Sequence, residues 1–258
     1  MFVIPMAGES RRFADAGFKI PKYQLQAHGE SVFSHAVRSF AHYFSTEPFL
    51  FVFRDIDGSS RFVHAECERL KIKHARFVVL DRMTNGQAET VALGMEKAAV
   101  SDDEPIVVFN IDTFRLNYRY PDLADAKTNY DGYLEVFIGE GDNFSYVRPH
   151  ADESGLVCET SEKRPISNLC STGLYHFRRS CDFRWAYANP CQPKGDAERR
   201  ERYVAPLYNS LISRGNRIGF VVIEPSSVIS CGTPEEYEQV RTSPEIARRL
   251  GAVASTAR

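Results

Sequence analysis

Continuous apolar runs alternate with segments of helical periodicity over the first half of the chain. Runs without polar alternation are typical of parallel strands that are buried on both faces. The predicted strands are Phe2–Met6, Phe49–Phe53, Arg76–Leu80 and Ile106–Ile111, and the predicted helices are Ser31–Tyr43, Ser59–Leu70 and Gly86–Ala98. Strands and helices that alternate at this spacing predict βαβ units, and therefore a Rossmann-like α/β fold with a mostly parallel central sheet.

The second half of the chain follows a different pattern, in which short strands are separated by turns. The predicted strands are Gly132–Gly139, Ser145–Pro149, Leu156–Thr160, Leu169–Phe177 and Arg217–Glu224, with helices at Asp182–Ala188 and Arg199–Arg214 and a helix-opening loop at Gly232–Tyr237. No linker rich in Pro, Gly or Ser divides the chain. We therefore expect one domain over residues 1–250, with a smaller mixed-β insertion in its second half and a frayed tail at 251–258.

The composition narrows the class of protein. With 43% hydrophobic and 26% charged residues in 258, the chain is typical of a globular protein and not of a disordered one. No apolar run approaches the ~18 residues of a membrane span, and the apolar N-terminal run is too short for a signal peptide. A formal net charge of −2 disfavours nucleic acid as a partner. The six cysteines show no Cys-x-x-Cys spacing, so we expect reduced thiols in a cytoplasmic protein without contact to membranes.

Parallel α/β sheets bind ligands beyond the carboxyl ends of their strands, which directs attention to two loops. The loop Ala7–Lys22 combines small residues with Arg11, Arg12 and Lys22. Small residues let backbone N–H groups approach an anion, and the cations match phosphate oxygens. The loop is neither Gly-x-Gly-x-x-Gly nor a P-loop. From these residues alone, a glycine turn with solvated arginines fits the loop as well as a phosphate site.

The second loop places Asp112 directly after a buried strand. Mg²⁺ prefers oxygen ligands and usually takes one or two protein carboxylates together with phosphates. The alternative is that Asp112 only caps the turn before Arg115. The residues by themselves leave both readings open.

These motifs, taken in order, resemble the nucleotidyltransferases that join a nucleoside triphosphate (NTP) to a phosphorylated sugar, choline or similar acceptor. The segments that carry the resemblance are Met6–Phe13 with Pro21-Lys22, Gly86–Thr90, Asn110–Asp112, Glu162–Pro165, Ser171–Phe177 and Cys231–Tyr237. The blocks Gly86–Val91, Phe109–Phe114 and Pro165–Tyr175 are most similar to cytidylyltransferases of bacterial capsule and surface-polysaccharide synthesis, including those that activate phosphoglutamine.

The resemblance implies a GT-A-like nucleotidyltransferase fold, with residues 1–130 as the NTP-binding half and 131–230 as the acceptor-binding half. It implies transfer from CTP, or another NTP, to a phosphorylated acceptor with release of pyrophosphate and with Mg²⁺ as cofactor. It assigns catalysis to Lys22, Arg12 and the metal ligand Asp112, nucleotide binding to Ala7, Gly8, Glu9, Ser10, Arg11, Gly86, Gln87 and Thr90, and acceptor binding to Glu162, Lys163, Asn168 and Thr172. Association into a homo-oligomer stays open.

The chain departs from the family at one position. Many members place a second metal-binding Asp two residues before the Gly of Gly-Thr-Pro, and this chain has Ser230 there. Either Mg²⁺ uses Asp112 with phosphates and water, or Glu224 or another acid supplies the second ligand. The departure keeps a nucleotide-binding regulatory protein as an alternative. A metal-dependent glycosyltransferase is another, although Asn110 stands where that class normally has a second acid.

Three residue-level alternatives also remain. Glu89 fits a partner of the helix dipole as well as a base-reading residue. Glu162 and Lys163 fit an exposed ion pair. The cluster of Arg199, Arg200 and Arg202 is typical of a solvated helix face.

Overall fold

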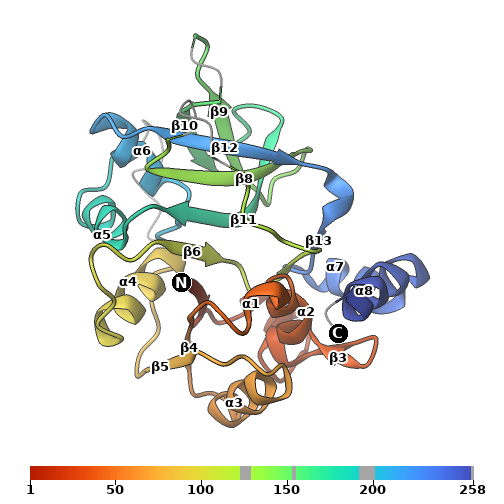
Figure 1. Cartoon of the computed structure of the whole chain (residues 1–258). Coiled ribbons are helices and arrows are strands. Elements are labelled where there is room, and N and C mark those ends of the chain that lie inside the picture. Colours follow the sequence, from red (N-terminus) through yellow and green to blue (C-terminus); the bar gives the residue numbers. More distant parts are fainter. Residues whose placement is uncertain (123–128, 153–154, 192–200, 257–258) are drawn as a thin grey trace.

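The fold is built around one large mixed sheet (Figure 1). We describe it from a computed structural model that covers residues 1–122, 129–152, 155–191 and 201–256, with side chains up to 251. Within these ranges the sheet has nine strands, in the order β10-β9-β11-β6-β1-β4-β5, with β8 paired to β11 and β12 paired to β8. These strands are β1 (Phe2–Met6), β4 (Phe49–Arg54), β5 (Ala75–Leu80), β6 (Ile106–Phe109), β8 (Gly132–Ile138), β9 (Ser145–Pro149), β10 (Val157–Glu162), β11 (Leu169–Phe177) and β12 (Ile218–Ile223).

The parallel part of the sheet comes from the first half of the chain. Strand β1 pairs in parallel with β4 on one side and with β6 on the other, and β5 continues the parallel order beyond β4. Strand β11 then pairs antiparallel with β6, and it joins this part to the strands of the second half. The predicted Rossmann-like α/β fold class is thereby confirmed.

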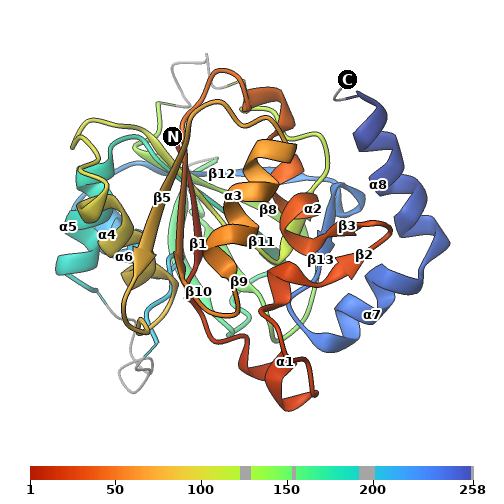
Figure 2. The ribbon, with the colours of Figure 1, turned by 90° about the horizontal axis from the view of Figure 1, so that it is seen from below.

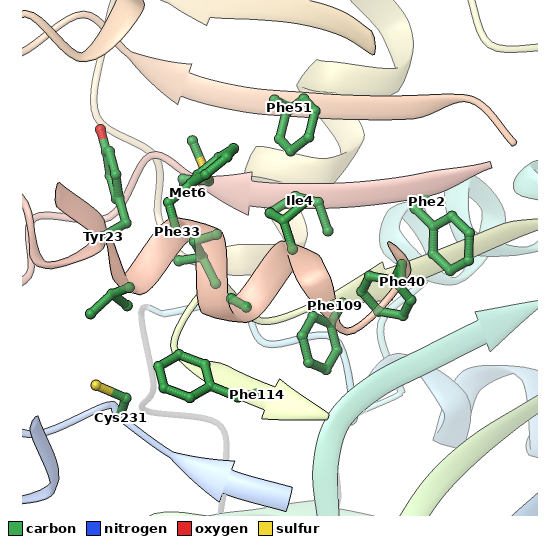
Figure 3. Close-up of a cluster of buried hydrophobic side chains, with 14 of the residues drawn as sticks. Phe2, Ile4, Met6, Tyr23, Phe33, Phe40, Phe51, Phe109, Phe114 and Cys231 are labelled. Atoms are coloured by element: carbon green, nitrogen blue, oxygen red, sulfur yellow. The ribbon is translucent and has the colours of Figure 1, made fainter. Parts of the chain in front are cut away.

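Helices cover both faces of the sheet (Figure 2). The bounds are α2 (Val32–Arg38), α3 (Ser59–Arg69), α4 (Gln87–Lys97), α5 (Ser180–Ala188), α6 (Leu207–Ser213), α7 (Pro234–Thr242) and α8 (Pro244–Thr256), with single turns α1 (Arg11–Asp15), η1 (Lys22–Gln24), η2 (Ala41–Tyr43) and η4 (Pro225–Ser227). Phe2 and Ile4 of β1 pack with α2 and α3 on one face (Figure 3). Val3 packs with α4, α5 and α6 on the other face. This alternation explains why β1 is apolar at every position. Among the helices of the described ranges, none combines the length and apolar character that spanning a bilayer requires.

Two predicted helices are shorter than expected. The helix predicted over Ser31–Tyr43 ends at Arg38, where the N–H groups of Ser39 and Phe40 donate to the carbonyls of Ala36 and Val37, and the separate turn η2 follows. The helix predicted from Arg199 begins only at Leu207, after a turn in which the N–H of Leu207 donates to the carbonyl of Val204. Pro206 stands at the start of this helix, where its missing N–H costs nothing.

Four short strands and the last helix were not predicted. Strand β7 (Thr113–Arg115) pairs antiparallel with β13 (Val228–Ser230), and three residues are too few to leave a pattern in the sequence. A second two-stranded sheet joins β2 (Gln26–Ala27) to β3 (Glu30–Ser31). Helix α8 continues to Thr256, past Ala252, where the sequence predicted the tail to fray.

The loop at Gly232–Tyr237 opens helix α7, as predicted, and it does so with a capping box. The hydroxyl of Thr233 accepts the N–H of Glu236 at 3.2 Å, and the carboxylate of Glu236 accepts the N–H of Thr233 at 3.1 Å. We expect Thr233→Ala to lower the free energy of unfolding by about 1 kcal/mol, the usual value of such a cap. Urea unfolding measures the change. Thr233→Ser keeps the hydroxyl and should remain near the wild-type value; an equal loss in both variants would contradict the capping role.

Candidate active site

A cavity of about 890 Å³ lies at the carboxyl ends of β1 and β6. Of the residues predicted for the site, those that line it are Ala7, Gly8, Glu9, Ser10, Arg11, Arg12, Lys22, Gly86, Gln87, Thr90, Asp112, Glu162, Lys163 and Thr172. Asn168 is the exception, because its side chain is exposed outside the cavity and its carbonyl accepts the N–H of Gly139 at 3.0 Å. The sequence thus predicted a set of residues that the fold does bring together, although they come from both halves of the chain.

Lys22 and Asp112 form an ion pair in this cavity. The Nζ of Lys22 lies 2.5 Å from Oδ2 of Asp112, and the two side chains are only 19% and 23% exposed. Lys22 begins the η1 turn, and Asp112 lies between β6 and β7. The backbone N–H of Cys231, directly after β13, donates to the carbonyl of Asp112 at 2.8 Å. The pairing of β7 with β13 therefore holds the aspartate from the far end of the chain.

The thiol of Cys231 does not add chemistry to this cluster. Burial, reinforced by the negative charge of Asp112, raises the pKa of Cys231 to about 12. The thiol is therefore protonated near neutral pH and serves as packing, in line with the prediction of reduced, structural cysteines.

The carboxylate of Asp112 suits a hard cation such as Mg²⁺. It faces the cavity and already has a positive group, the ammonium of Lys22, at bonding distance. No cluster of three or more His, Cys, Asp or Glu side chains able to hold a metal occurs in the described ranges. A site of one carboxylate completed by substrate phosphates and water is within what Mg²⁺ accepts.

Glu224, which the sequence suggested as a second metal ligand, does not lie in the cavity. Ser230 lines the cavity, whereas Glu224 is exposed and lies outside it. Among the acids that line the cavity, Glu236 lies near Asp112, because a Cβ at Gly232 would be 3.2 Å from Oδ2 of Asp112 and 3.5 Å from Oε2 of Glu236. Its Oε2 accepts the N–H groups of Gly232 and Thr233 at 2.7 and 3.1 Å, so it is held by the start of helix α7.

The glycine loop presents backbone donors to the cavity. Helix α1 begins after Ser10, which has a left-handed φ of 51°. Within the described part of the chain, no hydrogen bond uses the backbone N–H groups of residues 8–12. Arg11 lies 2.9 Å from Glu9, and both side chains are exposed, as is that of Arg12. Amides without internal acceptors, next to arginines at the rim, can receive an anion.

The turn before α4 packs against the backbone of Arg202, which the sequence predicted to lie in a helix. Gly86 has a φ of +115°, and a Cβ at this position would lie 2.6 Å from both N and O of Arg202. The N–H of Arg202 donates to the carbonyl of Asn85 at 2.6 Å, and Ala88 donates to the carbonyl of Arg202 at 2.9 Å. The guanidinium of Arg202 stacks 3.7 Å over the ring of Tyr187. The prediction of a solvated helix face is therefore wrong for Arg202, and Arg199 and Arg200 lie outside the described residues.

Glu89 stabilises the same turn through hydrogen bonds to Arg82 and Asn85, and it does not line the cavity. It is buried, and it accepts hydrogen bonds from Arg82 at 2.7 Å and from the amide of Asn85 at 2.9 Å. Burial alone raises the pKa of Glu89, but these donors outweigh it and lower the pKa below its usual range. Glu89 lies in the first turn of α4, where a carboxylate is favoured by the helix dipole. Glu89 orders the loop that precedes the helix.

The residues that the sequence assigned to the acceptor lie on a side of the cavity that is lined from β9, β10 and β11. Glu162 is only 5% exposed and accepts a hydrogen bond from Ser145, whose Oγ lies 3.2 Å from the hydroxyl of Tyr175. Lys163 lies 2.5 Å from the hydroxyl of Tyr203, with its ammonium 4.5 Å above the ring. The burial of Glu162 excludes the alternative of an exposed ion pair.

Thr172 lines the cavity, and its side chain contacts a buried ion pair between Glu135 and Arg115. Its hydroxyl donates to Glu135 at 3.1 Å, and Glu135 pairs with Arg115 at 2.9 Å. Arg115 belongs to β7, three residues after Asp112. The network therefore joins the strand that carries Thr172 to the strand that follows the aspartate.

Several lining residues were not predicted as site residues. They are Asn110, Asn143, Ser145, Tyr175, Glu201, Tyr203 and Glu236. Ser145 and Tyr175 belong to predicted strands, and their burial could not be read from the sequence, because other polar residues occur in the same strands. Tyr203 left no signal either, because it lies outside every helix and strand.

Comparison with solved structures places the chain among nucleotide-transferring enzymes. It is 47% identical to the nucleoside-diphosphate-sugar pyrophosphorylase from Vibrio cholerae RC9, with a TM-score of 0.87 over 94% of this chain and 100% of that one. The inositol-1-phosphate CTP transferase from T. maritima is 12% identical, with a TM-score of 0.74 over 98% and 95% of the two chains. A putative glucose-1-phosphate thymidylyltransferase from Bacillus anthracis is 18% identical, with a TM-score of 0.70 over 97% and 98%. The last two likenesses show the fold alone.

Two further comparisons gave no match. No model of a protein family matches the chain, and neither does any curated protein.

Proposed function

The chain belongs to the nucleoside-diphosphate-sugar pyrophosphorylase family of nucleotidyltransferases, and from this premise we propose that it transfers a nucleotidyl group from an NTP to a phosphorylated small acceptor. Pyrophosphate is the second product. The proposed nucleotide is CTP, and the proposed setting is the cytoplasmic synthesis of precursors for a bacterial capsule or surface polysaccharide. The setting rests on the sequence resemblance of the blocks Gly86–Val91, Phe109–Phe114 and Pro165–Tyr175.

The observation that carries the proposal is the position of the Lys22–Asp112 pair. It lies in one cavity together with the backbone donors of the glycine loop, the buried Glu162 and the half-buried Lys163. A transfer between two phosphates needs a cation and an anionic metal ligand at the point where the substrates meet. The Lys22–Asp112 pair would supply both groups.

The acceptor supplies its own nucleophile in this proposal. A phosphate monoester is mostly dianionic at neutral pH, because its second pKa is about 6. Its oxygen can attack the α-phosphorus in line without a general base, so the reaction needs positioning and charge stabilisation. We assign Lys22 to the α-phosphate, and Arg12 with the amides of residues 8–12 to the β- and γ-phosphates.

Asp112 is the residue that would hold Mg²⁺, with substrate phosphates and water as the other ligands. A bound Mg²⁺ supplies neutralisation of the negative charge on the triphosphate. Glu162 and Lys163 are assigned to the acceptor, with the ammonium kept in the cavity by the hydroxyl of Tyr203.

A pyrophosphate-release screen tests the proposal. The four NTPs are each combined with phosphorylated sugars, polyols and amino-alcohols in the presence of Mg²⁺. Release that depends on both substrates supports nucleotidyl transfer. Transfer from a nucleotide sugar without pyrophosphate release would instead identify a glycosyltransferase. Tight NTP binding without turnover on any acceptor would identify a regulatory nucleotide-binding protein, the alternative that Ser230 motivates.

We expect CTP to bind more tightly than ATP, GTP and UTP. Cytosine presents a donor amine and acceptors on its pairing edge, and the backbone of Ala7 and Gly8 with the amide of Gln87 offers the complementary mixture. Uracil reverses two of these groups and would leave buried partners unpaired. One such mismatch costs about 1–3 kcal/mol, which corresponds to about 5- to 150-fold in affinity. Calorimetry with all four nucleotides measures this order; equal binding of UTP or a purine would remove the assignment of CTP.

A further inference from the structure

The side chain of Asn110 lies in the cavity between Gln87 of helix α4 and Gly173 of strand β11, and no role has been assigned to it. It follows the last residue of β6, two positions before Asp112, and it lines the cavity. Its own N–H donates to the carbonyl of Gly173 at 3.2 Å, where the register of β11 shifts. Asn110 thus joins the end of the central parallel strand to the strand that carries the acceptor residues.

The carboxamide of Asn110 is held tightly at this point. Gly173 has a φ of +84°, and a Cβ at Gly173 would lie 2.4 Å from Nδ2 and 2.6 Å from Cγ of Asn110. A Cβ there would force the side chain of Asn110 to move, and the positive φ by itself favours glycine at this position, so the carboxamide lies directly against the backbone of Gly173. A carboxamide packed against backbone in this way has little rotational freedom.

Asn110 in turn holds Gln87, the residue that we assign to the nucleobase. The Nε2 group of Gln87 donates a hydrogen bond to Oδ1 of Asn110. A carboxamide has nearly the same shape when its oxygen and nitrogen are exchanged, so its partners decide which end faces a ligand. Here the amide nitrogen of Gln87 is engaged by Asn110. Within the described part of the chain, no hydrogen bond uses the Oε1 of Gln87.

We propose that Asn110 is a positioning residue that sets nucleobase specificity, because it holds the carboxamide of Gln87 with its oxygen available to a base. This inference rests on the proposed nucleotide site and deepens it. An exposed carbonyl oxygen accepts from an exocyclic amine, such as N4 of cytosine, and repels the O4 carbonyl of uracil. Without Asn110 the amide can turn over and offer its N–H to O4 instead. The site then no longer distinguishes an amino base from a keto base.

The test compares the ratio of kcat/KM for CTP to that for UTP in five proteins: the wild type, two single variants of Asn110, Gln87→Leu, and the double variant Gln87→Leu with Asn110→Leu. Asn110→Leu removes the acceptor at similar volume, and the ratio should fall from the wild-type value of about 5–150 toward 1. Asn110→Asp keeps an oxygen opposite Gln87 and should preserve preference for the amino base. In a Gln87→Leu background, adding Asn110→Leu should change the ratio no further, because the amide that it orients is gone.

The ratio is independent of the amount of active enzyme, so partial misfolding of a variant does not obscure the result. A general structural role would lower both kcat/KM values together and leave the ratio unchanged in Asn110→Leu, which would overturn the inference. A wild-type protein that prefers UTP would overturn it as well, because the oxygen of Gln87 would then not face the base. Failure of the proposed function is a different outcome: the wild-type protein would bind no NTP in calorimetry.

Discussion

Replacement of Asp112 by asparagine is expected to lower turnover by at least ~100-fold, the usual cost of removing one group that stabilises charge in the transition state. The change keeps the shape of the side chain and removes its charge. The backbone contact from Cys231 is unaffected, because it involves the carbonyl of residue 112. The fold should therefore be retained while an anionic ligand for Mg²⁺ is lost. Pyrophosphate release at saturating Mg²⁺, together with the thermal unfolding midpoint, separates these two effects.

Glu224→Gln is the matched control for this variant. Glu224 is the other acid that the sequence raised as a metal ligand, and the structure places it on the surface outside the cavity. Its neutralisation should leave turnover near the wild-type value. Near wild-type turnover of Asp112→Asn at saturating Mg²⁺ would end the metal assignment, whatever Glu224→Gln does.

Lys22→Ala is expected to lower turnover by about 10²- to 10³-fold, and to weaken NTP binding far less. Charge on the phosphate oxygens grows as the bond to pyrophosphate breaks, so a cation near the α-phosphate contributes most in the transition state. Single-turnover kinetics give the rate of the chemical step, and calorimetry gives the affinity. If only the affinity changed, Lys22 would be a ground-state anchor and its assigned role would be wrong.

The ion pair between Lys22 and Asp112 allows a second test of Lys22, a double-mutant cycle. Because Lys22 and Asp112 contact each other directly, their effects should not be additive. The double variant Lys22→Ala with Asp112→Asn should lose less activity than the product of the single losses. Lys22→Arg retains the charge on a longer and planar group, and it should recover part of the turnover only if charge is more important than exact position.

The parallel half of the sheet was predictable because each of its strands is buried on both faces. Phe2 and Val3 contact opposite helical layers, and such strands are apolar without interruption. The errors have other physical causes. Phe40 is buried although its helix has already ended at Arg38, and β7 and β13 are too short to show periodicity. A pattern of hydrophobic residues reports burial, and it carries no information on which three-residue segments pair.

The site residues that directly follow a strand or begin a helix could be predicted from the sequence. Lys22, Gln87 and Asp112 are found together in the cavity on that basis. Asn168 was misplaced, since a turn residue between strands can face either side. The relation between Asn110 and Gly173 could not be predicted, because it depends on a register shift in β11 that appears only once the strands are paired.

The pairing of β7 with β13 also sets the order in which this centre is completed during protein synthesis. Chains fold as they leave the ribosome, beginning with the N-terminal part. Lys22 and Asp112 emerge early, together with β1, β4, β5 and β6. The N–H of Cys231 that holds the carbonyl of Asp112 is made only after the last strand of the large sheet, β12. A nascent chain can therefore form the parallel half of its sheet well before the backbone of Asp112 is held in place.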